Sequence, residues 1–277
     1  MIVDGRSIAE ALNMRVKAHV AALPLPITLG IVVVGSDPVI ANFVGIKKRV
    51  AEQVGVILKE FHFSEGIAEE ALLREVSLLS KEVTLDGLII QLPLPAHIVS
   101  QQILNAVDIE KDVDMLSQGA RAAFSQGSAK ILPPVAGAIQ EILEQHKIGV
   151  GGKDVLILGH GRLVGAPAAL LMRHNHAHVT VVDKEVEHLA DLTREADIII
   201  SGVGQPGILR PDMLKQGVVL IDAGTSEDGG KIVGDADPRC ADVAALFTPV
   251  PGGVGPITVA VIFKNVSILA THRDRTK

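Results

Sequence analysis

The sequence has no tryptophan and no tyrosine, and only 6 of its 277 residues are phenylalanine. Without tyrosine there is no phenol to act as an acid or base, which excludes the Tyr-x-x-x-Lys mechanism of short-chain dehydrogenases. So few phenylalanines also make a base-stacking platform for single-stranded nucleic acid hard to build. The shortage of aromatic side chains therefore argues against two classes of function before any motif is considered.

Cysteine and positive charge are also scarce. The single cysteine, Cys240, cannot form an internal disulfide, which is typical of a reducing compartment. It lies in a polar segment, and we do not expect it to be a nucleophile. There are 26 Lys and Arg against 32 Asp and Glu, a formal net charge of −6, and there is no basic tail or stripe. We therefore expect no binding to nucleic acid.

Long hydrophobic runs are missing as well. No uninterrupted apolar run approaches ~20 residues, the length needed to span a bilayer. The first six residues carry charge where a signal peptide needs its apolar stretch. We expect a cytoplasmic protein with no membrane partner.

The chain is instead rich in aliphatic residues, and hydrophobic residues make up 48 % of it. Such a core suits parallel sheets covered by helices. The predicted strands are 27–34, 56–61, 87–91, 154–158, 178–182, 198–201 and 218–222. The predicted helices are 38–54 (with Gly55 as its C-cap), 68–80, 136–146, 163–174, 189–195 and 257 to about 273. This alternation predicts an α/β protein with right-handed βαβ crossovers, and the glycines of 149–152 are the candidate domain boundary.

A glycine-rich turn lies between the strand at 154–158 and the helix that follows it. Gly159, Gly161 and Gly165 allow a tight turn and a close approach of the backbone to a phosphate, next to the N-terminus of a helix. The spacing is G-x-G-x-x-x-G instead of the usual G-x-G-x-x-G, and such turns also occur without a ligand. In this strand–turn–helix context we predict an NAD(P) site. Its loop residues are Gly159, His160, Gly161, Arg162, Leu163, Val164 and Gly165.

Asp183 ends the next predicted strand, about 20 residues past the loop, where a carboxylate accepts hydrogen bonds from the adenosine ribose. Because a carboxylate repels a 2′-phosphate, Asp183 favours NAD over NADP. Arg162 and Lys184 lie nearby in sequence and can accommodate a phosphate, so both cofactors stay open. The alternative is an ordinary solvated aspartate at a strand end.

Three alternating histidines, His174, His176 and His178, invite interpretation as a metal site. They straddle the end of a helix and the start of a strand, so their side chains are expected to scatter. No carboxylate or cysteine completes a ligand set. We predict no metal site.

A series of motifs runs in order over almost the whole chain. They are Gly35–Pro38, Val44–Lys47, Asp86–Pro95, Lys111–Asp114, Gly159–Pro167, Gly204–Gly207, Ile221–Gly224 and Thr248–Pro256. Together they resemble the methylenetetrahydrofolate dehydrogenase/methenyltetrahydrofolate cyclohydrolase family. The most specific are Gln-Leu-Pro-Leu-Pro from Gln91 and Thr-Pro-Val-Pro-Gly-Gly-Val-Gly-Pro from Thr248.

The resemblance implies two α/β domains with a folate cleft between them, and a homodimer. We assign residues 1–137 to an N-terminal parallel-sheet folate domain and residues 138–256 to a Rossmann-type NAD(P)-binding domain. Residues 257–277 are then a C-terminal helix that returns to the first domain. The implied reaction is oxidation of 5,10-methylenetetrahydrofolate with NAD or NADP, followed by hydrolysis of the methenyl product to 10-formyltetrahydrofolate.

The resemblance also implies residue roles. Lys47 is the acid/base group, Gln91 positions it, and Asp114 holds the amino edge of the pterin. The implied substrate contacts are Phe43, Pro251, Gly252 and Gly253, and the implied further cofactor contacts are Gly204 and Thr225.

The residue chemistry agrees with these roles. A lysine buried in an apolar helix has a lowered pKa, which suits proton transfer. Without the resemblance, the sequence predicts that Lys47 is a solvated helix lysine and that Asp114 is one of many loop carboxylates. Gln91 ends an apolar strand where open α/β sheets bind ligands, although a strand-end amide bonded to a loop is an equal alternative.

The sequence departs from the family at four places. Phe43 stands where the family has tyrosine, and Met115 where Lys-Asp-Val-Asp is usually followed by glycine. Residues 133–136 replace a Pro-Cys-Thr-Pro stretch. His160-Gly161 and Asp183-Lys184 replace Arg-Ser and His-Ser, which removes expected partners of a 2′-phosphate. We expect a working dehydrogenase, with a hydrolase-only relative and a non-catalytic folate- or nucleotide-binding paralogue as the alternatives.

Overall fold

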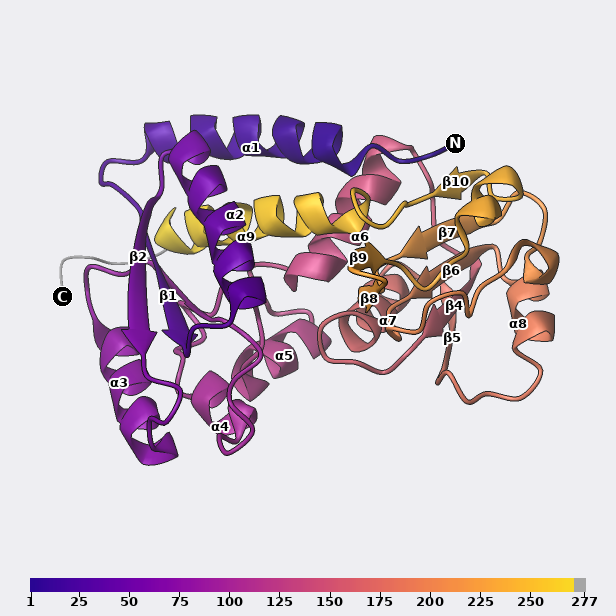
Figure 1. Ribbon diagram of the computed structural model, residues 1–277. Helices are drawn as coiled ribbons and strands as arrows, with labels where there is room; N and C mark the ends of the chain where they lie inside the picture. Colours follow the sequence, from indigo (N-terminus) through magenta and orange to yellow (C-terminus); the bar gives the residue numbers. More distant parts are fainter. Residues whose placement is uncertain (272–277) are drawn as a thin grey trace. The chain divides into compact units, whose positions relative to one another are not determined.

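The computed structural model describes residues 1–271, which form two compact units (Figure 1). The first unit combines Met1–Glu10 with Val135–Thr258, and the second combines Ala11–Pro134 with residues 259–271. Two long helices, α1 (Gly5–Ala22) and α9 (Val254–Thr271), therefore each have residues in both units.

The second unit is built on a three-stranded parallel sheet of order β2-β1-β3. Its strands are β1 (Thr28–Val34), β2 (Ile57–Phe63) and β3 (Gly87–Ile90). These are the predicted strands, with their ends shifted by one or two residues. Because all seven residues of β1 are buried, this strand is the centre of the unit.

Four shorter helices complete this unit: α2 (Pro38–Val54), α3 (Glu69–Lys81), α4 (Ser100–Asn105) and α5 (Gln118–Ser125). Asp37 caps α2, since its Oδ1 accepts hydrogen bonds from two backbone N–H groups of the first turn, at 2.6 and 3.3 Å. Gly55 ends α2 in the left-handed conformation with φ 80°, which confirms the predicted C-cap. One core cluster joins α3 and α4 to β1 and β3 through Leu72, Val76, Ile103, Val32 and Ile90.

The C-terminal helix α9 packs on the second unit, as predicted. Asn265 Nδ2 donates to the carbonyls of Val113 at 2.9 Å and Leu132 at 2.8 Å, and Ser267 Oγ lies 3.2 Å from Nδ1 of His19 in α1. The helix is long and apolar enough to cross a membrane, but 56 % of its residues are buried, which identifies a core helix. It begins three residues before the predicted start, and predicted helical residues 272 and 273 lie outside the described residues.

The first unit contains a five-stranded parallel sheet of order β10-β7-β6-β4-β5. Its strands are β4 (Asp154–Leu158), β5 (His178–Val182), β6 (Ile198–Ser201), β7 (Val219–Asp222) and β10 (Leu246–Phe247), and its helices are α6 (Pro134–Gln145), α7 (Gly165–His174) and α8 (Leu189–Glu195). The order confirms the predicted Rossmann-type sheet. An antiparallel hairpin of β8 (Ser226–Asp228) and β9 (Lys231–Val233) and 3-10 turns at Pro211–Met213 and Pro238–Asp242 complete the unit.

Several elements were not predicted: α1, α4, α5, β10 and the β8–β9 hairpin. For α1 the sequence did contain a helix-start signal, the capping residue Asp4. In the structure its Oδ1 accepts the backbone N–H groups of residues 6 and 7, both at 3.1 Å. Ala9, Leu12 and Val16 then follow at helical spacing and are buried.

The expectation that Cys240 lies in a polar loop is wrong. Cys240 belongs to the hydrophobic core of the first unit, and burial raises the pKa of its thiol to about 11.

Candidate functional site

Lys47 is a buried lysine on the apolar face of α2. The buried residues of this helix are Ile40, Val44, Lys47, Ala51 and Val54, so the lysine occupies a core position. Its side chain is only 8 % exposed, and its Nζ donates a hydrogen bond of 2.9 Å to Oε1 of Gln91. Burial lowers the pKa of Lys47 from its usual 10.5, while the charge of Asp114 acts in the opposite direction. The uncharged amine is therefore more accessible near neutral pH than in a solvated lysine.

Gln91 directly follows β3 at the carboxyl end of the sheet. Its backbone N–H donates to the Val32 carbonyl at 2.9 Å, which holds the residue against β1. Its side-chain Nε2 donates to the Leu92 carbonyl at 2.9 Å, so the amide oxygen is left facing Lys47. The predicted strand included Gln91, whereas β3 ends at Ile90. The side chain nevertheless lies at the predicted edge of the sheet.

Asp114 completes this group of three in the second unit. Burial raises the pKa of Asp114 to about 6, the positive charge of Lys47 lowers it, and the nearby Asp112 raises it further. Asp112 has a structural role, because its carboxylate accepts the backbone N–H groups of Leu116 at 3.2 Å and Ser117 at 2.8 Å. Met115, where the resemblance to the family led us to expect glycine, adopts φ 56°, a left-handed conformation that glycine enters freely.

The implied substrate contacts lie in both units. Phe43 is on α2, one helical turn before Lys47, and is 42 % exposed. Pro251, Gly252 and Gly253 belong to the first unit, in a turn before α9. There the Gly5 backbone N–H donates to the Gly252 carbonyl at 3.0 Å, and Gly252 has φ 105°.

The glycine loop joins β4 to α7 as predicted, although the helix begins at Gly165 and not at 163. Gly159 ends the strand with φ 99°. A Cβ placed on Gly165 would lie 1.9 Å from the Gly159 carbonyl oxygen, so only glycine lets α7 begin this close to the strand. His160, Gly161 and Leu163 face solvent, while Arg162 and Val164 are partly buried. A close-packed turn with an open outer side fits a dinucleotide phosphate.

Asp183 lies next to this loop because β5 pairs with β4, with Val182 opposite Leu158. Oδ2 of Asp183 is 3.6 Å from Nε2 of His160, and both side chains are largely exposed. Gly204, with φ 66°, and the exposed Thr225 follow β6 and β7. In a parallel sheet these loops share the carboxyl edge, so the predicted cofactor residues gather at one end of the first unit.

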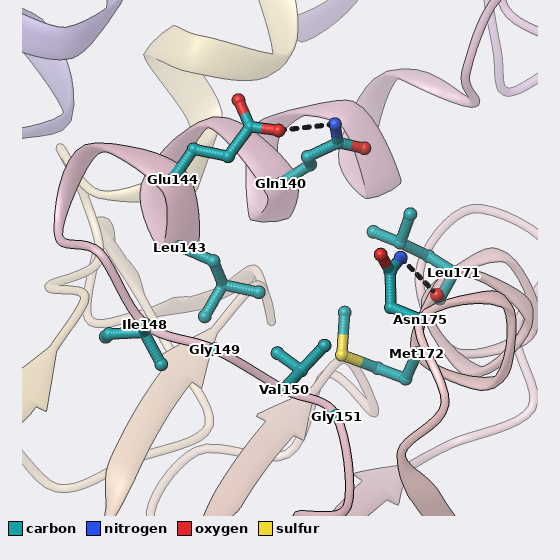
Figure 2. A pocket seen from close by; sticks show the side chains of 10 residues that line it. All are labelled: Gln140, Leu143, Glu144, Ile148, Gly149, Val150, Gly151, Leu171, Met172 and Asn175. Atoms are coloured by element: carbon teal, nitrogen blue, oxygen red, sulfur yellow. Dashed lines mark hydrogen bonds between the residues drawn. The ribbon is translucent and has the colours of Figure 1, made fainter.

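Figure 2 shows a pocket in the first unit between α6, α7 and residues 148–151. Its volume is about 230 Å³, and it lies beside the segment that enters β4, at the opposite end of that strand from the glycine loop. Its polar side chains already have partners: Gln140 Nε2 donates to Glu144 at 2.6 Å, and Asn175 Nδ2 donates to the Leu171 carbonyl at 2.8 Å. Because the pocket lies at the opposite end of β4 from the glycine loop, it is separate from the predicted cofactor site.

Within residues 1–271 no group of three or more His, Cys, Asp or Glu side chains is arranged to hold a metal ion. Two buried carboxylates to which the sequence analysis assigned no role, Asp222 and Asp235, lie in the first unit. The sequence feature that could have indicated them is their position, because Asp222 ends an apolar run and Asp235 directly follows a glycine.

Comparison with known proteins covers both units. Residues 3–114 match the family model for the tetrahydrofolate dehydrogenase/cyclohydrolase catalytic domain, and residues 133–274 match the model for its NAD(P)-binding domain. The bifunctional protein FolD of Nautilia profundicola is 37 % identical over 269 residues, covering 95 % of both chains.

Solved structures agree with this match. The bifunctional FolD methylenetetrahydrofolate dehydrogenase/cyclohydrolase of Campylobacter jejuni has a TM-score of 0.96 and 31 % identity over 99 % of both chains. The Trypanosoma brucei enzyme, solved with NADP and an inhibitor, has a TM-score of 0.91 and 33 % identity over 98 % of this chain and 97 % of its own.

Proposed function

Because this chain belongs to the tetrahydrofolate dehydrogenase/cyclohydrolase family, we propose that it is a bifunctional enzyme of one-carbon metabolism. It oxidises 5,10-methylenetetrahydrofolate with NAD(P) and hydrolyses the methenyl product to 10-formyltetrahydrofolate. The observation that carries this proposal is the buried Lys47, bonded through Nζ to Gln91 Oε1 at 2.9 Å within the segment that matches the catalytic domain. Turnover of both folates by the purified protein tests it.

In the first reaction, a hydride passes from the methylene carbon of the folate to the nicotinamide. The chain's own residues hold the folate for this step. Asp114 accepts hydrogen bonds from the amino edge of the pterin, since a carboxylate opposite two N–H donors forms a strong bidentate pair. Phe43 packs its ring against the flat pterin, and Pro251, Gly252 and Gly253 supply a loop without bulky side chains beside the folate.

In the second reaction, water attacks the methenyl carbon and one carbon–nitrogen bond breaks. The uncharged amine of Lys47 takes a proton from the attacking water and returns one to the released pterin nitrogen. Because burial lowers its pKa, both transfers are easier for Lys47 than for a solvated lysine. Gln91 fixes the direction of the amine by accepting one of its hydrogen bonds. The net products are 10-formyltetrahydrofolate and one proton.

The carboxyl edge of the first unit is the proposed NAD(P) site. The glycine loop 159–165 contacts the pyrophosphate, and Gly204 and Thr225 line the nicotinamide side. We assign the folate function to residues 1–137 and 257–277 and the dinucleotide function to residues 138–256. The first ten residues, which pack with the NAD(P)-binding unit, have a structural part in this division.

NAD is the proposed preferred cofactor because Asp183 places a negative charge where the 2′-phosphate of NADP would lie. We expect Asp183→Ser to raise kcat/KM with NADP by about tenfold, since a like-charge repulsion of roughly 1–2 kcal/mol is removed. The ratio of kcat/KM with the two cofactors, measured for both proteins, checks this. Asp191→Ser, an exposed aspartate on α8, is the matched control. A wild-type enzyme that prefers NADP would overturn the assignment.

Phe43 is proposed to set the balance between the two reactions. Restoring the hydroxyl with Phe43→Tyr adds a hydrogen-bonding group one helical turn from Lys47. We expect the ratio of hydrolysis to oxidation to rise severalfold, because a hydroxyl near the lysine can orient the attacking water. Steady-state rates of each reaction, measured separately, give the ratio. If both rates stay unchanged, the hydroxyl has no role in this enzyme.

A cytoplasmic homodimer is the proposed state of the protein. Strand β2 is at the edge of its sheet, its outer side has no partner strand within residues 1–271, and Ile57 at its start is 48 % exposed. Such an edge is suited to pairing with a second copy. Sedimentation equilibrium is expected to give twice the chain mass of 29.1 kDa. A monomer at micromolar concentration would contradict this proposal.

A further inference from the structure

Asp235 is a fully buried carboxylate, 0 % exposed, that takes no part in the chemistry proposed above. It lies between Gly234 and Ala236, after the β8–β9 hairpin. Burying a charge costs free energy unless hydrogen bonds compensate for it. The bonding partners of Asp235 therefore indicate its function.

Asp235 receives three hydrogen bonds, all from one short segment. Its Oδ2 accepts from Ser201 Oγ at 2.6 Å and from the Val203 backbone N–H at 2.9 Å, and its Oδ1 accepts from the Gln205 backbone N–H at 2.8 Å. Ser201 is the last residue of β6, and the other two partners lie in the loop that follows. A single side chain thus fixes the path of residues 201–205, including Gly204 with its positive φ.

This segment in turn packs on the glycine loop. A Cβ placed on Gly202 would lie 2.4 Å from Cγ1 of Val164, and one placed on Gly159 would lie 3.0 Å from Cγ1 of Val203. Since β6 and β4 are neighbours in the sheet, the two loops leave the same edge (Figure 1). Any shift of residues 202–203 must move the residues that we propose to contact the dinucleotide.

Asp222, at the end of β7, holds Asp235 in place. Its Oδ2 accepts the Ala236 backbone N–H at 2.8 Å, and its Oδ1 accepts the Gly224 backbone N–H at 2.9 Å. Each carboxylate packs against a glycine beside the other: a Cβ on Gly224 would lie 2.2 Å from the Asp235 carboxyl carbon, and a Cβ on Gly234 would lie 2.1 Å from Oδ2 of Asp222. Burial, together with the neighbouring charge of Asp235, raises the pKa of Asp222 to about 6. So costly an arrangement of two buried acids is consistent with a precise positioning role.

We propose that Asp235 is the positioning residue of the dinucleotide site, and that it acts by holding residues 201–205 against the glycine loop. This inference rests on the proposed function, since it assigns the support of the same NAD(P) site. It identifies a residue that touches neither cofactor nor folate. The methenyl hydrolysis reaction, which needs no nicotinamide, then becomes an internal control.

The test is Asp235→Asn, which keeps the shape of the side chain but places an NH₂ donor against donors. We expect KM for NAD(P) to rise by about tenfold or more, because an acceptor for buried N–H groups is lost. The kcat at saturating cofactor and the rate of methenyl hydrolysis are expected to stay within about twofold. Asp237→Asn, two residues along, removes a carboxylate paired with Arg239 at the surface and is the matched control, with no change in KM.

Ser201→Ala is the second variant and removes only one of the three hydrogen bonds. We expect a rise of severalfold in KM for NAD(P), again with hydrolysis retained, and this result decides the matter if Asp235→Asn does not fold. An unchanged KM in the folded variant would overturn the proposal, and so would a parallel loss of both activities. If the wild type itself reduces no NAD(P), the proposed function fails, which is a different result from a failure confined to the variants.

Discussion

Lys47→Met is expected to lower the rate of methenyltetrahydrofolate hydrolysis by about 10²–10⁴-fold, the usual contribution of a positioned acid/base group. The substitution keeps the aliphatic stem in the core of α2 and removes only the amine, so the helix is expected to fold normally. Stopped-flow or steady-state loss of the methenyl chromophore measures the rate. The effect on oxidation is expected to be smaller, because hydride transfer itself needs no proton from the enzyme.

Lys48→Met is the matched control, because Lys48 is the next residue on the same helix and its side chain is 60 % exposed. It is expected to leave both rates unchanged. The pH profile adds a second readout. Because burial lowers the pKa of Lys47, the wild-type hydrolysis rate is expected to rise with pH through that lowered pKa. The rate of Lys47→Met is expected not to show this rise with pH. Equal rates for the Lys47 and Lys48 variants would refute the assigned role.

Asp114→Asn is expected to lower kcat/KM for methylenetetrahydrofolate by about 10²–10³-fold, since a charge-assisted pair with the pterin becomes a weaker neutral contact. Both reactions should lose activity, unlike the selective loss of cofactor binding expected for Asp235→Asn. Steady-state kinetics at saturating cofactor measure the change. Glu110→Gln, an exposed carboxylate nearby in the same loop, is the control and should leave kcat/KM unchanged.

The same substitution is expected to stabilise the fold at alkaline pH. The folded-state pKa of Asp114, about 6, lies above its usual 3.8, so the folded protein holds this proton more tightly than the unfolded chain does. The contribution to stability is full below pH 3.8 and is lost as the pH rises through 6. At pH 8, Asp114→Asn should raise the free energy of unfolding by about 1–2 kcal/mol. This value is smaller than the pKa shift alone would give, because Asp114 is partly exposed and solvent screens its charge. Urea unfolding at two pH values checks this, and a less stable variant at pH 8 would contradict it.

The sequence was sufficient to predict strands β1 to β7, because β1, β4 and β6 are mostly aliphatic and the turns between strands and helices carry their own glycines and caps. It also located the glycine loop and Asp183, whose spacing follows from the length of one βα unit. Helix α1 was missed although Asp4 and the 9, 12, 16 spacing indicated it. The short elements α4 and α5 gave too few turns for a clear apolar period.

Contacts between distant residues were beyond the reach of sequence patterns. The bond from Lys47 to Gln91 joins residues 44 positions apart, and it was expected only from the resemblance to the family, which made Gln91 the residue that positions Lys47. Asp235 is a stronger example, since Gly-Asp-Ala in a polar stretch resembles many surface turns. Its burial depends on Ser201, 34 positions earlier, and on two glycines whose missing Cβ atoms leave room for the carboxylates.

Turnover of 5,10-methylenetetrahydrofolate by the purified protein is the most direct test of the bifunctional assignment. The protein is mixed with this folate and either NAD or NADP, and the reduced nicotinamide and the methenyl product are followed together. We predict reduction of the nicotinamide, with NAD preferred, and then decay of the methenyl product faster than in the enzyme-free control. Methenyl hydrolysis without reduction would contradict the dehydrogenase, and the absence of both reactions from the folded protein would contradict the assignment as a whole.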